Sequence, residues 1–158
     1  MTFVIVPFRR VHLDQMDEQA VTRYLRPHLS VELLESWERS PHCFTALHDG
    51  QVVGCGGIHD YYPGTPRQRG EAFAILDGSR SRRAFPVLFR AMARILRQSG
   101  FRRIEAVVDE GFTPGHRLAF LLGFQVETRD TFGRPAAMRG YRPDGRGAVL
   151  YSRIREVL

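Results

Sequence analysis

The sequence predicts an α/β fold, and three observations in its second half carry that prediction. Residues 70–76 (GEAFAIL) and 102–110 (RRIEAVVDE) are apolar runs of strand length. Between them, apolar side chains recur at helical spacing over residues 85–96, which indicates a long amphipathic helix. Residues 113–124 follow, with a proline at their start and a glycine near their end, as is typical of a short helix.

The N-terminal part predicts one strand and two helices. Residues 3–8 have the composition of a strand, and Pro7 suggests an edge position or a bulge because proline cannot donate to a β-ladder. Residues 13–28 carry apolar side chains at mostly helical spacing, and residues 31–39 are expected to form a second, shorter helix.

Residues 43–57 predict a β-hairpin that turns at Asp49-Gly50, a strong two-residue turn signal. With that turn and regular pairing, Cys43 and Cys55 project from opposite faces of the sheet, which argues against a disulfide. We therefore expect two free thiols. The glycine-rich run inside the second strand is interpreted as a bulge and not as a phosphate-binding loop, because no helix follows it.

A polar, basic loop at residues 77–83 joins the strand at 70–76 to the long helix. The first amides of a helix have no partner within the helix and point outward with the positive end of its dipole. A strand that leads into a helix through such a loop is therefore a site where a phosphorylated ligand can bind.

The order and spacing of these elements resemble the acyl-CoA-binding core of the GNAT N-acetyltransferases. The ending Leu122-Gly123-Phe124 matches that family, as does the position of Thr113-Pro114. The resemblance covers nearly the whole chain and implies a single domain over residues 1–158, with a mixed, mostly antiparallel sheet flanked by helices. It also implies acetyl-CoA as co-substrate, with strand backbone offered to pantetheine by Phe73 and Ile75, and with the pyrophosphate held by Arg80, Ser81, Arg82, Arg83, Ala84 and Phe85.

Four residues depart from the family pattern. Arg83 and Phe85 stand where the phosphate loop has small residues, whose role is to let backbone amides approach the pyrophosphate. Ala119 stands where many active members have the tyrosine that protonates the leaving thiolate, and Phe112 where they often have asparagine. These departures resemble divergent GNAT-like proteins of tailed phages. They keep a second function open, that of a catalytically degenerate virion or assembly protein whose partners are other phage structural proteins.

Glu71 is the candidate general base, because some GNAT enzymes use a carboxylate at this strand position to take a proton from an acceptor amine. The alternative is an exposed edge glutamate or an ion-pair partner of Arg69 or Arg103. Glu105 and Asp109 on the next strand are further candidates that the sequence does not distinguish. The acceptor amine itself is not identified by the sequence.

Composition restricts the partners. All 23 basic residues are arginine, the net charge is +6 and the pI is near 10.1, which permits an anionic partner such as CoA. Both missing residues, lysine and asparagine, have A-rich codons, so we favour a GC-rich genome over selection of arginine for phosphate contact or exclusion of lysine from an acetylating enzyme. Nucleic acid stays the weaker partner. Three scattered histidines (His42, His48 and His59) do not suggest a metal site. No apolar run is long enough to span a membrane, and we expect a cytoplasmic protein, or alternatively a virion-associated one.

Overall fold

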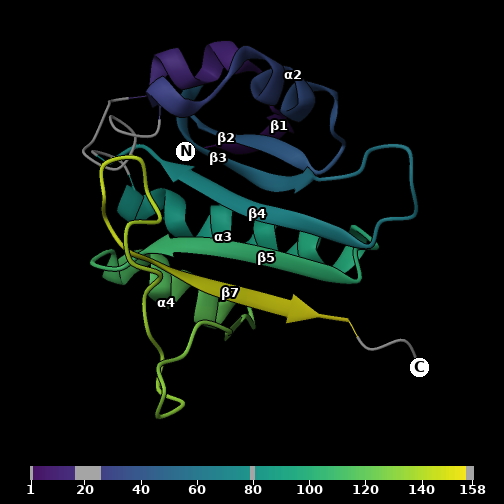
Figure 1. Cartoon of the computed structure of the whole chain (residues 1–158). Helices are drawn as coiled ribbons and strands as arrows, with labels where there is room; N and C mark the ends of the chain where they lie inside the picture. Colours follow the sequence, from purple (N-terminus) through teal and green to yellow (C-terminus); the bar gives the residue numbers. More distant parts are fainter. Residues whose placement is uncertain (1, 17–25, 79–80, 156–158) are drawn as a thin grey trace. The chain divides into compact units, whose positions relative to one another are not determined.

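The computed structural model describes residues 2–16, 26–78 and 81–155, and it confirms the predicted α/β fold (Figure 1). Seven strands form one sheet in the order β1-β2-β3-β4-β5-β7-β6. Strands β4 and β5 run parallel, as expected for the two strands joined by the long helix, and β1–β2, β2–β3, β5–β7 and β6–β7 are antiparallel.

The elements are, in chain order, β1 (Phe3–Pro7), the 3-10 helices η1 (Arg10–Gln15) and η2 (Arg26–His28), α2 (Val31–Arg39), β2 (Cys43–His48), β3 (Gln51–Asp60), β4 (Arg69–Leu76), α3 (Ser81–Gln98), β5 (Arg103–Asp109), α4 (Thr113–Leu121), β6 (Gln125–Val126) and β7 (Ala148–Ile154). The chain forms two compact units: residues 1–59 with 72–99, and residues 60–71 with 100–158.

The prediction of a helix over residues 13–28 is wrong at both of its ends. Residues 10–15 and 26–28 are 3-10 helices, while residues 17–25, and so the centre of that prediction, lie outside the described part of the chain. Leu13 and Met16 are both buried. Their spacing of three residues matches one turn of a 3-10 helix as well as it matches an α-helix, so the sequence pattern could not distinguish the two.

The predicted hairpin is confirmed, but its register is not. Asp49 and Gly50 both have positive φ (48° and 78°), as a two-residue type I′ turn requires. The pairing then shifts by one residue between Ala46 and Leu47. Because a shift of one residue exchanges the two faces of a strand, the prediction for the cysteines is wrong. Cys43 and Cys55 lie in the same buried cluster, although both are free thiols as expected.

The glycines of β3 allow close packing in the first unit. A Cβ atom at Gly54 would lie 2.9 Å from Leu88 Cδ1 of α3, and one at Gly56 would lie 3.0 Å from Met92 Sδ of α3 and 2.9 Å from the Phe73 carbonyl oxygen of β4. Larger residues at these two positions would push the helix and the neighbouring strand away. The glycine-rich run is thus a packing surface that lies just beyond the bulge.

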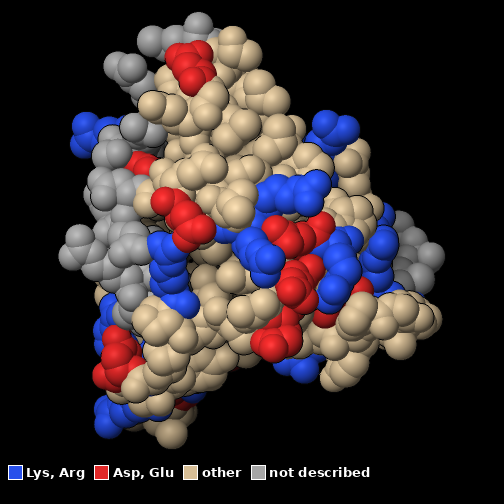
Figure 2. All heavy atoms as spheres, turned by 90° about the horizontal axis from the view of Figure 1, so that it is seen from above, with Lys and Arg blue, Asp and Glu red and all other residues tan. Residues whose placement is uncertain are grey.

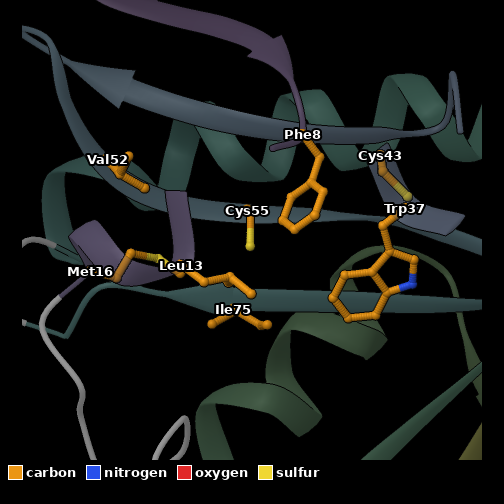
Figure 3. Packing of buried hydrophobic residues seen from close by; sticks show 8 residues of the cluster. All are labelled: Phe8, Leu13, Met16, Trp37, Cys43, Val52, Cys55 and Ile75. Atoms are coloured by element: carbon orange, nitrogen blue, oxygen red, sulfur yellow. The ribbon is translucent and has the colours of Figure 1, made fainter. Parts of the chain in front are cut away.

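A second apolar layer of the first unit contains Phe8, directly after β1, and residues from η1, α2, β2, β3 and β4 (Figure 3). The largest side chain in it is Trp37 of α2, which is 5% exposed. Its ring stacks on Phe73 of β4, with centroids 3.8 Å apart, and meets the edge of Phe8 at 5.6 Å. This layer fixes residues 72–76 of β4 in place, and β4 carries three of the nine predicted site residues: Glu71, Phe73 and Ile75.

In the second unit, β5 pairs with β7 along seven residues, and α4 packs against β5 and contacts Tyr151 of β7 through His116. Gly115 of α4 lies so close to Val108 of β5 that a Cβ atom there would be 2.8 Å from Val108 Cγ1. Gly123 has a φ of 82° and ends α4 as predicted. The short strand β6 was not predicted, because two residues are too few to form a pattern.

Candidate functional site

The expected phosphate site lies in the first unit, where β4 leads into α3. Asp77, the first residue after β4, is 1% exposed, and its backbone amide donates to the Val53 carbonyl over 3.0 Å. Helix α3 begins at Ser81, earlier than the sequence predicted, and its first turn contains no acidic residue. This helix has 18 residues, with arginines and no carboxylate at its start. Its N-terminus is therefore positively charged, as the binding of a phosphate requires.

Of the six predicted phosphate-loop residues, only two have described side chains. Arg82 is exposed, and Phe85 is half-buried and stacks on Phe89 one turn later, with centroids 6.3 Å apart. Phe85 therefore belongs to the apolar face of α3, as its spacing suggested. Arg80 lies outside the described residues, as do the side chains of Ser81, Arg83 and Ala84. The positive charge at the start of α3 fits an acyl-CoA pyrophosphate. Contact between the backbone amides of this loop and the pyrophosphate stays a prediction.

The predicted pantetheine-contacting residues lie on the same strand. Ile75 is buried and Phe73 is half-buried, both in the apolar layer that contains Trp37. Their side chains pack in this layer and leave the backbone groups of the strand for the predicted contact with pantetheine.

The candidate base Glu71 lies on the part of β4 that belongs to the second unit. It does not pair with Arg69 or Arg103. Instead, the hydroxyl of Tyr61 donates a hydrogen bond of 2.7 Å to Glu71 Oε2. Burial, together with the bond to Glu71, raises the pKa of Tyr61 above its usual value, so the phenol remains a proton donor. The guanidinium of Arg69 lies over the Tyr61 ring, 4.9 Å from its centroid.

Glu105 is the β5 residue directly opposite Glu71 in the parallel pair, and its surroundings are different. Arg69 binds it through two hydrogen bonds of 3.0 and 2.8 Å, and Arg103 donates a third of 2.6 Å. Burial alone would raise the pKa of Glu105, but the bonds and charges of the two arginines lower it below its ordinary value. A carboxylate held in this way is a poor base.

Asp109, the other candidate base, is also in an ion pair. It is 8% exposed, and Arg142 donates to its Oδ1 over 2.6 Å. Arg142 also donates to the Val107 carbonyl over 3.3 Å. The pair attaches the irregular stretch 133–147 to β5. Of the three carboxylates that the sequence left open, only Glu71 has a hydroxyl donor and no arginine partner among the described residues.

Helix α4 has Ala119 at the position where many active family members have a tyrosine. Ala119 is 5% exposed and packed. One turn earlier, His116 forms a hydrogen bond of 2.8 Å between Nδ1 and the hydroxyl of Tyr151 on β7. Its Nε2 lies 3.0 Å from the Glu110 carbonyl. Since a carbonyl only accepts, Nε2 carries a proton and donates it to the Glu110 carbonyl.

Sequence reasoning missed Tyr61. The residue belongs to a Tyr-Tyr pair at the start of the Pro/Gly loop at 61–69, and this pair next to the candidate strand was the only signal for it. Basic and acidic side chains are intermixed on the face that Figure 2 shows, with no uniformly basic surface there. In the described part of the chain, no cluster of His, Cys, Asp or Glu could hold a metal ion, and no helix is both long and apolar enough to cross a bilayer.

Comparison with known proteins gives one family match. Residues 11–124 match the Acetyltransferase (GNAT) family. No curated protein matches the chain. Among solved structures, Ard1 from Thermoplasma volcanium is 17% identical and has a TM-score of 0.69, covering 99% of this chain and 100% of its own. A GNAT-family acetyltransferase from Bacillus anthracis is 14% identical, with a TM-score of 0.66 and coverage of 96% of this chain and 94% of its own.

A third solved structure contains a ligand. It is yncA from Salmonella typhimurium, described as an acetyltransferase with its cofactor acetyl-CoA, and it is 14% identical with a TM-score of 0.66. It covers 100% of this chain and 96% of its own. At such identities these likenesses establish the fold.

Proposed function

The chain belongs to the GNAT acetyltransferase family, and from this membership we propose that it transfers an acetyl group from acetyl-CoA to an amine. Acetyl-CoA supplies the activated thioester. In the proposed reaction, the amine nitrogen attacks the thioester carbonyl, the new C–N bond replaces the C–S bond, and CoA leaves as the thiolate. The chain must therefore accept a proton from the amine and hold the co-substrate in place.

The observation that carries the proposal is the position of Glu71. It is a half-buried carboxylate on the central parallel pair of a GNAT fold, and a protonated tyrosine hydroxyl fixes one of its oxygens. We propose that its remaining lone pairs accept the amine proton, directly or through water. The neighbouring carboxylates Glu105 and Asp109 are held by arginines and are not assigned this role.

The residues proposed to bind acetyl-CoA follow from the family resemblance. The backbone of Phe73 and Ile75 would contact pantetheine, and the start of α3 would hold the pyrophosphate through the residues Arg80, Ser81, Arg82, Arg83, Ala84 and Phe85. The absence of acidic residues from the first turn of α3 supports the second part. The donor of a proton to the leaving thiolate is not assigned.

A second candidate function rests on the altered phosphate loop. Arg83 and Phe85 replace the small residues of the family, and side-chain charge does not fully replace a fixed ring of amides. A degenerate GNAT-like protein would then act through surface contacts, for example as a phage virion or assembly component.

Calorimetric titration with acetyl-CoA, combined with an assay of CoA release in the presence of amines, separates the two functions. Because of the altered loop we expect binding weaker than ~100 μM, or roughly 5.5 kcal/mol. Amine-dependent CoA release supports the enzyme even at that affinity. Undetectable binding heat together with no CoA release would favour the degenerate protein.

A further inference from the structure

The second unit contains a basic depression at one end of its sheet. It has a volume of about 470 Å³ and lies where β4 and β5 begin and where β7 ends. Its lining is formed by Gln68, Arg69, Arg102, Arg103, Ile154 and Arg155. Four of these six residues are arginines, which come from three strands and the residues beside them.

The charges of this depression are only partly compensated. Arg69 and Arg103 bind Glu105, and Arg103 also binds Glu127 over 2.5 Å. These bonds hold the two guanidiniums in place. Arg102 and Arg155 are exposed, and within the described part of the chain neither side chain belongs to an ion pair. Among the described residues, the four arginines thus have two carboxylate partners, Glu105 and Glu127, and the side chains of Arg102 and Arg155 are exposed.

The depression lies next to the candidate base. Arg69 and Glu71 are two residues apart on β4, so their side chains project from the same face of the sheet. Two strand residues correspond to about 6.6 Å along β4. A molecule whose amine lay at Glu71 would reach Arg69, at the near side of the depression, with a group several bonds away from its nitrogen.

We infer that the acceptor is an amine that carries an anionic group, a carboxylate or a phosphate, about five or six bonds from the nitrogen. This inference rests on the proposed function, since it places the amine at Glu71. Guanidiniums bind both oxyanions through paired N–H donors. The same four arginines repel a second positive charge, so diamines of equal length are poor acceptors.

Three amines of matched length test the inference: aminohexanoate, hexylamine and diaminohexane. With acetyl-CoA present, we expect aminohexanoate to have the highest kcat/KM and diaminohexane the lowest. Aminopentyl phosphate distinguishes a phosphate from a carboxylate preference. In the double variant Arg102→Gln/Arg155→Gln, KM for aminohexanoate should rise about tenfold with kcat nearly unchanged, while hexylamine is unaffected. Equal KM values for aminohexanoate and hexylamine in the native protein would overturn the inference.

The matched control is Arg90→Gln/Arg97→Gln, which removes two exposed charges from α3. This control should leave the preference for aminohexanoate over hexylamine intact. If the two double variants lower that preference equally, the preference comes from the net charge of the protein and not from the depression, which would contradict the inference. Binding without acetyl-CoA, measured by NMR titration at low salt, gives a readout that does not need turnover. If no amine is acetylated but aminohexanoate binds more tightly than hexylamine, the proposed function fails and the anion site stands; equal weak binding of both amines removes the site as well.

Discussion

Strand β4 has two kinds of surroundings along its eight residues. Residues 72–76, in the first unit, lie among apolar side chains, and Phe73 stacks on Trp37. In the second unit, Arg69 forms an ion pair with Glu105, and Glu71 accepts a hydrogen bond from Tyr61. The comparison teaches that one strand can provide stability with one part and polar chemistry with another. Substitutions in the apolar part should therefore lower the free energy of unfolding, and substitutions at Glu71 or its partner Tyr61 should lower turnover.

The largest expected effect is that of Glu71→Gln. If Glu71 is the general base, turnover should fall by about two to four orders of magnitude, while acetyl-CoA binding and unfolding change little. Steady-state kinetics and calorimetry give the two readouts. Glu110→Gln, at an exposed position of the same unit, is the matched control and should retain full turnover. Unchanged turnover in Glu71→Gln would remove this residue from the mechanism.

Trp37→Ala tests the apolar part of the strand. Truncation of a buried tryptophan leaves a cavity beside Phe73, and the free energy of unfolding should fall by roughly 3–5 kcal/mol. Chemical denaturation measures it. Trp37→Phe is the control: the indole N–H has no hydrogen-bond partner within the described part of the chain, so losing it costs nothing, and a ring remains to stack on Phe73. Equal losses in both variants would contradict this account of the apolar layer.

Glu105 adds a pH-dependent contribution to stability. Its pKa is lowered in the folded protein, so its ion pairs stabilise the fold above the ordinary glutamate pKa of about 4.3 and lose that effect as pH falls through the lowered value. Glu105→Gln should lower stability by about 2 kcal/mol at neutral pH, between the values for exposed and buried pairs. The difference from the native protein should shrink below pH ~4. Denaturation curves across that range measure it, and a pH-independent difference would argue against the ion pairs as its source.

The sequence predicted the elements better than their pairing. The helix at 31–39 has the predicted bounds, because it has a periodic apolar pattern and a clear end. The faces of Cys43 and Cys55 were wrong because one extra residue at a bulge reverses every later side chain, and no composition signal fixes its position.

For the candidate site, too, the sequence predicted the position of a residue better than its contacts. The position of Glu71 on the fourth strand followed from the family resemblance and from the apolar run around it. Its partner Tyr61 lies ten residues earlier in a loop, and loop contacts of this kind have no periodicity from which to predict them. The assignment of Arg69 and Arg103 to Glu105 depends on strand register, which the sequence did not fix.

The smallest expected effect concerns the hydrogen bond between Tyr61 and Glu71. Tyr61→Phe keeps the ring under Arg69 and removes only the hydroxyl that fixes Glu71 Oε2. Because this bond is exposed, water can replace the hydroxyl as donor to the Glu71 carboxylate, and we expect a loss of about 1 kcal/mol; kcat should fall by roughly five- to tenfold while KM for acetyl-CoA stays the same. Tyr62→Phe, at the exposed neighbouring residue, serves as the control and should behave as the native protein does. If Tyr61 only packs against Arg69, then Tyr61→Phe retains full kcat, and the hydroxyl has no part in positioning the base.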